Sequence, residues 1–265
     1  MANDLVNYEA QWAGQAQEVL EHERPTGGAF FSTRAGQLML GDEPMPGNQV
    51  ACIVIDFLRM NTYYPEKWDA DNPLPPVCYA IGRTEEEMAP HPTMQSDLTW
   101  FKPQSMDCHS CRNNEWGSAE QGRGKACQNR RQLALIPAGY YSARRGSRDF
   151  DLHLFDDPAH YLSADVAFLR LPVTSVNAWA KYANSVAANF RRPPAGVITC
   201  ISVVPDQKYQ YTVAFETIEQ VPDALARAVI ERTRIQMEDP PRGFQAPSQE
   251  DRGPRGGRSI RTLRR

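Results

Sequence analysis

Residues 108–127 read CHSCRNNEWGSAEQGRGKAC, and the rest of the chain is organised around this stretch. Two residues separate Cys108 from Cys111, so both thiols of one tight turn can hold a single metal ion. Cys127 can close on the same ion after a basic, glycine-containing loop. Tetrahedral zinc takes four ligands and accepts thiolate sulfurs at about 2.3 Å. The spacing predicts a zinc ribbon whose fourth ligand lies elsewhere in the sequence.

Cys78 is the fourth ligand we predict, because it follows a proline-rich turn and lies apart from any unbroken apolar run. His91 and His109 are alternatives, although His109 lies inside the CxxC turn and would point away from its metal. An iron–sulfur cluster would also use four cysteines. The cofactor that we predict is Zn²⁺, held by Cys78, Cys108, Cys111 and Cys127.

The length and composition are typical of one large domain with an insertion and tails. The chain has 265 residues, of which 41 % are hydrophobic and 21 are prolines. No apolar run approaches the roughly 20 residues that span a bilayer, and the first residues do not resemble a signal peptide. We therefore expect an intracellular protein without a membrane partner, in which clustered cysteines favour metal over disulfides.

Positive charge is concentrated in two places, although the formal net charge is −3. Between Lys102 and Arg148, nine basic residues stand against three acidic ones, and between Arg242 and Arg265 seven arginines stand against two carboxylates. Such local basic stripes can attract a polyanion even in a mildly acidic protein.

Hydrophobic periodicity predicts mostly short strands with three helices. The expected strands are a hairpin over 29–40, a buried strand over 49–59, strands over 77–82, 131–137, 150–155 and 166–171, and a hairpin over 196–215. The expected helices cover 3–22, 176–190 and 221–237, and residues 139–148 are expected to form a basic, aromatic loop. Cys52 and Cys200 fall in apolar runs and are expected in the core.

This pattern predicts a mainly β, α+β fold: a small antiparallel barrel or curled sheet with flanking helices and a zinc ribbon inserted in one connection. The barrel domain would cover residues 1–240, with the ribbon at about 78–130. Residues 241–265 would form a disordered basic tail.

Motifs for catalysis are missing, and we predict that the protein is not an enzyme. The sequence has no GxSxG, P-loop, GxGxxG or HExxH motif. Asp149, Asp151, Asp156 and Asp157 could form a nuclease cluster, but they flank a strand and a turn, where solvated carboxylates are common.

Basic and aromatic side chains are mixed around the cysteines, and the mixture recurs in the loop over 139–148. Aromatic faces stack on unpaired bases, while arginine and lysine follow the phosphates. The predicted nucleic-acid-binding residues are Lys102, Arg112, Trp116, Arg123, Lys125, Arg130, Arg131, Tyr140, Tyr141, Arg144 and Arg145.

The chain resembles uncharacterised proteins of tailed bacteriophages in Cys78 and in residues 108–119, 122–127 and 131–135. The expected architecture is similar to the T4-type single-stranded-DNA-binding proteins of those phages, which have an OB-fold with an inserted zinc module. The resemblance implies an OB-like barrel that coats single-stranded DNA in phage replication or recombination. It also implies replication or recombination proteins as partners, and the cytoplasm of the infected bacterium as location.

Two features depart from the T4-type pattern. That family has a histidine among its zinc ligands, and its members commonly end in an acidic arm, whereas this chain ends in a basic one. The acidic arm that recruits partners in that family has no counterpart in this sequence. An alternative function is a zinc-containing protein–protein adaptor of the replication or transcription machinery, and the choice between DNA and RNA stays open.

Overall fold

The computed structural model describes residues 30–66, 74–120, 122–147 and 149–238. The helix predicted over residues 3–22 and the tail predicted over residues 241–265 lie outside these ranges. Within the described residues, no helix is long and apolar enough to cross a membrane.

Within these ranges, nine strands form one mixed sheet and two more form a separate hairpin. Neighbouring strands follow the order β11-β10-β4-β6-β9-β1-β2-β3, and β5 pairs with the far half of β4. The strands of the sheet are β1 (Phe30–Arg34), β2 (Gln37–Leu40), β3 (Glu43–Pro44), β4 (Gln49–Tyr63), β5 (Cys78–Gly82), β6 (Gln128–Pro137), β9 (Ala167–Leu171), β10 (Val197–Asp206) and β11 (Gln210–Gln220).

The fold is mainly β with a few helices, as predicted. The sheet curls into a half-barrel and does not close, so of the two predicted forms the curled sheet is found and the antiparallel barrel is not. The strands β1 and β9 pair in parallel, while the other pairs are antiparallel. Asn48 bridges the gap between the β1–β2 hairpin and β10, because its side-chain amide donates to the carbonyls of Gly36 (3.0 Å) and Val203 (2.6 Å). Its backbone is left-handed (φ 60°), which asparagine tolerates better than most residues.

Both faces of the sheet are covered where β4 begins. Helix α3 (Val176–Phe190) packs Trp179 and Val186 against one face, in a cluster with Val54 and Leu133. Helices α2 (Pro158–Ser163) and α4 (Asp223–Glu238) cover the other face, where Leu225 joins a cluster with Ile53 and Ile55. Because helices cover both faces of this half of β4, its sequence is a continuous apolar run without alternation. Each of its fully buried apolar side chains stabilises the fold by about 1.5–3 kcal/mol.

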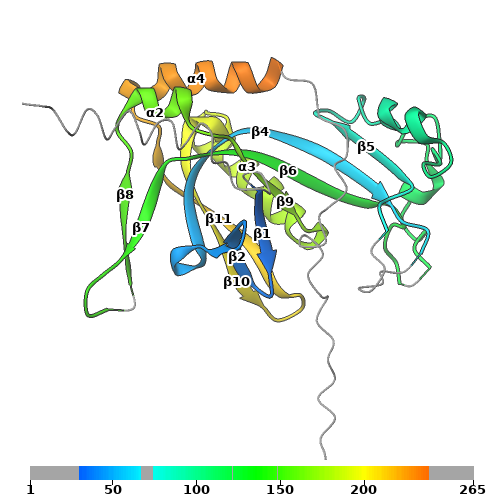
Figure 1. The fold of residues 1–265 in the computed structure, drawn as a ribbon, viewed down its shortest axis with the longest axis horizontal. Coiled ribbons are helices and arrows are strands. Elements are labelled where there is room, and N and C mark those ends of the chain that lie inside the picture. The colour runs from blue at the N-terminus through cyan, green and yellow to red at the C-terminus, as the bar shows by residue number, and fades with distance from the viewer. Residues whose placement is uncertain (1–29, 67–73, 121, 148, 239–265) are drawn as a thin grey trace, which may run out of the picture.

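The far half of β4 leaves this core after a bulge between Val54 and Asp56. There β4, β5 and β6 extend as an arch beyond the helices (Figure 1). A small cluster on one face of the arch contains Met60, Tyr79 and Met94, the last from the 3-10 helix Pro92–Asp97. The other face of the arch receives the cysteines.

The segment between β5 and β6 is not a ribbon. Its described residues contain 3-10 turns and loops, and none of them forms a strand. We call residues 105–127 the cysteine knuckle. Two glycine-containing turns pack together inside it, since the N–H groups of Gly117 and Ala119 both donate to the carbonyl of Gly124 (2.9 and 3.2 Å).

Residues 139–148 were predicted as a loop, but most of them form a hairpin. The strands β7 (Gly139–Ala143) and β8 (Phe150–Leu154) pair in antiparallel register and project at the end of the molecule opposite the knuckle (Figure 1). The predicted hairpin over 29–40 and the helices over 176–190 and 221–237 are confirmed within two residues of their expected bounds. The hairpin predicted over 196–215 is also confirmed, although β11 continues to Gln220.

Candidate metal centre and nucleic-acid interface

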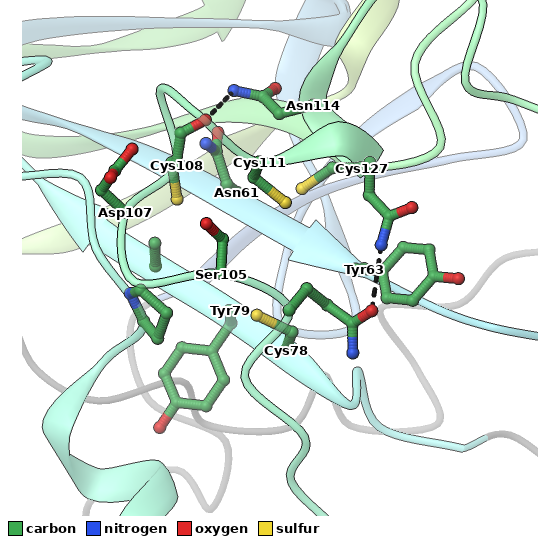
Figure 2. A pocket seen from close by; sticks show the side chains of 14 residues that line it. Asn61, Tyr63, Cys78, Tyr79, Ser105, Asp107, Cys108, Cys111, Asn114 and Cys127 are labelled. Carbon is green, nitrogen blue, oxygen red and sulfur yellow. Dashed lines mark hydrogen bonds between the residues drawn. The ribbon is translucent and has the colours of Figure 1, made fainter.

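All four predicted metal ligands line one small pocket at the end of the arch. Cys78 begins β5 opposite Tyr63, Cys127 immediately precedes β6, and the CxxC turn lies in the connection between these two strands. The pocket has a volume of about 20 Å³, room for one small ion, and Asn61 and Ser105 also line it. Figure 2 shows the cysteine side chains around this shared space.

Backbone hydrogen bonds hold the cysteines in place. The Cys127 N–H donates to the carbonyl of Asn113 (2.7 Å), and the Cys108 N–H donates to the carbonyl of Met88 (2.8 Å). The side-chain amide of Asn114 donates to the Cys108 carbonyl (2.7 Å), and its N–H donates to the Cys111 carbonyl (2.9 Å). The two ends of the knuckle are therefore joined without any bond between sulfurs, and all four thiols are free.

The pocket opposes negative charge when no cation is present. Burial, followed by the nearby thiols of Cys108, Cys78 and Cys111, raises the pKa of Cys127 to about 12. Burial is also the largest cause that raises the pKa of Cys108 and of Cys78. Cys78, Cys108 and Cys127 therefore favour the neutral thiol unless a cation compensates their thiolates.

The four thiols surround the pocket more loosely than metal ligands do. Within the described residues, no group of three or more His, Cys, Asp or Glu side chains has the spacing to hold a metal ion. Cys78 lines the pocket, whereas the alternative ligands His91 and His109 do not. His91 instead stacks on Tyr79 (ring centroids 5.4 Å) and bonds Thr93 through Nδ1 (2.8 Å).

Trp116 is the most exposed aromatic ring of the knuckle. It is 80 % exposed, and the Lys125 ammonium lies 5.8 Å from its ring centroid. Lys125 also donates to the side-chain oxygen of Asn114 (3.2 Å), so the cation is held beside the ring. Arg112 and Arg123 are exposed on the same knuckle. A flat aromatic face with one cation beside it is therefore presented to solvent, on a knuckle that carries two further exposed arginines.

The remaining predicted residues near the knuckle differ in their surroundings. Lys102 is exposed, and its N–H donates to the carbonyl of Val77 (2.7 Å). Arg130 and Arg131 are neighbours on β6 and point to opposite faces of the arch. Arg130 donates to the side-chain oxygen of Gln128 (2.5 Å), whereas Arg131 lies on the face that carries the knuckle.

The second predicted set, on the β7–β8 hairpin, lies at the other end of the molecule (Figure 1). Tyr141 is half-buried and donates its hydroxyl to Cys200 Sγ (3.4 Å). Arg144 forms an ion pair with Asp151. Tyr140 is 55 % exposed and stacks on His153, and Arg145 is exposed near the tip of the hairpin. The structure thus separates the two sets that the sequence places one loop apart.

Two residues on the arch were missed by sequence reasoning. Phe57 is 40 % exposed, and Arg59, two positions further on the same face of β4, pairs in register with Arg131. Both were included in a strand that we expected to be buried throughout. The signal that could have found them is the arginine that interrupts the apolar run at the end of the predicted strand.

Comparison with family models, with curated proteins and with solved structures finds no match for this chain. The function is therefore argued from the geometry of the arch and the knuckle.

Proposed function

We propose that this protein binds single-stranded DNA without sequence preference, in phage DNA replication or recombination. The observation that carries the proposal is Trp116, an exposed ring beside Lys125 on a basic turn that hydrogen bonds hold in place. Stacking of a base on an aromatic side chain is worth about 1–3 kcal/mol and tolerates any base, because every base has a π-face. Arg112 and Arg123 would contact the adjoining phosphates.

Zinc has a structural role in this proposal. Four thiols line one pocket, and burial followed by the neighbouring thiols raises the pKa of Cys127, so a bound cation would favour its thiolate form. Zinc prefers four thiolate ligands at about 2.3 Å, so its binding would draw Cys78, Cys108, Cys111 and Cys127 closer together. The ion would fix the turn that presents Trp116, and it would leave no open position for catalysis.

The test measures fluorescence anisotropy of labelled oligo-dT and of a duplex, over a series of salt concentrations. We expect tight binding to the single strand that weakens steeply with salt. The substitution Trp116→Ala should weaken binding about 5–150-fold, as expected for the loss of one stacked base. Oligo-U measured in parallel decides between DNA and RNA.

Tyr209→Ala is the matched control. Tyr209 is 43 % exposed, and the Lys208 ammonium lies 5.0 Å from its ring, so this pair has the same chemistry on the β10–β11 hairpin. We expect it to bind like the wild type. Equal losses in the two variants would contradict an interface at the knuckle. Absence of binding at physiological salt would overturn the proposal and favour the protein–protein adaptor.

A further inference from the structure

Two arginines face each other on the arch, between the helix-covered core and the knuckle. Arg59 on β4 and Arg131 on β6 are Cα partners in the antiparallel register. Directly opposite side chains on one face have Cβ atoms about 4.5–5.5 Å apart, and like charges at such positions destabilise a sheet. Burial, followed by the charge of Arg59, lowers the pKa of Arg131. The fold therefore keeps an unfavourable pair of cations on this face.

The negative charge near this pair is small and solvated. Arg59 Nη1 forms an ion pair with Glu85 Oε1 (2.8 Å), and the Glu85 side chain is 72 % exposed. Arg131 donates Nη1 to the carbonyl of Arg130 (2.9 Å), and in the described part of the chain no carboxylate lies within ion-pair distance of it. One exposed carboxylate therefore offsets two guanidinium groups, and an anion could bind to both.

An aromatic ring lies beside the arginine pair on the side of the core. Phe57 precedes Arg59 by two residues on the same face of β4 and meets Trp179 edge-on (ring centroids 5.5 Å). In the other direction the face continues to Asn61 and Asn129.

Hydrogen bonds connect this face to the knuckle. The amide of Asn129 donates to the side-chain oxygens of Asn61 (2.6 Å) and Asn114 (3.0 Å), and Asn114 also accepts from Lys125. Since Lys125 lies beside Trp116, hydrogen bonds link the asparagines that follow the arginine pair to the cation beside the aromatic ring of the knuckle.

We propose that Arg59 and Arg131 together bind a phosphate of the single strand, whose bases stack on Phe57 on one side and on Trp116 on the other. This inference rests on the proposed function and adds the path of the strand along the arch. A guanidinium group can donate two parallel hydrogen bonds to phosphate, and two opposed groups make a clamp. The aromatic neighbours favour a nucleic-acid phosphate over a peptide carboxylate.

The experiment compares the full-length variants Arg59→Gln, Arg131→Gln and Glu85→Gln with the wild type, using labelled oligo-dT over a salt series. Each arginine variant should bind about ten-fold more weakly at moderate salt. The slope of log affinity against log salt should fall by about 0.7 for one lost phosphate contact. Glu85→Gln should bind more tightly, because the competing carboxylate is gone.

Thermal unfolding distinguishes a binding role from a structural one. Removal of one of two facing cations should leave the melting temperature of Arg131→Gln unchanged or higher, although its DNA affinity falls. Arg131→Lys keeps the charge and should restore the salt slope. Arg227→Gln, at an exposed position on α4, is the matched control and should change neither quantity.

The outcomes separate this inference from the proposed function. Suppose that the wild type binds oligo-dT and that both arginine variants bind with the same affinity and the same salt slope. This result would overturn the phosphate site and leave the proposed function standing. A lower melting temperature together with unchanged affinity would assign the pair to the fold alone. If the wild type does not bind oligo-dT, both proposals fall.

Discussion

Asp56 is a buried carboxylate at the bulge where β4 leaves the core. Its side chain is 6 % exposed; it accepts from the Phe57 N–H (2.8 Å) and pairs with Arg83 (2.8 Å), which begins the segment leading to the knuckle. Breaking a buried pair leaves an uncompensated charge. Asp56→Ala should lower the free energy of unfolding by about 3 kcal/mol, the lower end of the usual cost, because Arg83 keeps some contact with water. Urea unfolding followed by circular dichroism measures this loss.

Glu231→Gln is the control for Asp56, because it removes an acid from an ion pair on the surface of α4. Glu231 and Arg234 are both largely open to solvent, and exposed pairs contribute little to stability. Its urea midpoint should match that of the wild type. If Asp56→Ala unfolds at the same midpoint too, the pair with Arg83 does not hold the arch to the core.

At the scale of elements, Ser175 attaches the start of α3 to the edge strand β11. Ser175 is fully buried, and its hydroxyl oxygen accepts from the Val213 N–H (3.0 Å), which points away from β10. Ser175→Ala leaves this buried donor without an acceptor and should cost about 1–3 kcal/mol in the free energy of unfolding. The neighbouring Thr174→Ala, at an exposed position, should cost nothing measurable. Equal urea midpoints for the two variants would contradict this role.

Local patterns predicted the elements, and long-range contacts decided what the patterns could not. Alternation identified the β10–β11 hairpin, and helical spacing identified α3. The strand β4 runs to Tyr63, beyond its predicted end at Arg59, because the knuckle and β5 bury the polar residues Asn61 and Thr62. The strand β7 was missed because its glycine, tyrosines and serine read as a loop until β8 supplies a partner.

Some residues of the candidate site could also be predicted from local sequence, whereas others depend on long-range structure. The spacing of the cysteines identified Cys108, Cys111 and Cys127, and the proline-rich turn before Cys78 identified the fourth residue of the same pocket. Exposure of Phe57 depends on where the helices end over the sheet, and the opposition of Arg59 and Arg131 depends on strand register. Neither property is local, so the sequence pattern alone could not predict it. The open curl of the sheet and the parallel β1–β9 pair are non-local for the same reason.

At the scale of the whole molecule, the knuckle and the sheet should respond differently to loss of metal. The two large core clusters contain no residue between 83 and 127 among those described, so the main sheet does not depend on the knuckle for its burial. Removal of zinc by a chelator should therefore speed hydrogen exchange in peptides covering residues 108–127 and leave β10 and β11 protected. Affinity for oligo-dT should fall by about ten-fold or more, because the turn that presents Trp116 loosens.

Two cysteine variants make this prediction specific. Cys127→Ser should lose the metal and reproduce the chelated state, whereas Cys200→Ser should keep one zinc per chain, since Cys200 accepts from Tyr141 on the far side of the sheet. Metal content, hydrogen exchange and anisotropy are measured on the same preparations. If chelation also removes the protection of β10 and β11, the metal supports the whole fold. If Cys127→Ser binds as much zinc as the wild type, the four-cysteine site is wrong. If DNA binding weakens on loss of zinc while β10 and β11 stay protected, the ion serves to position Trp116.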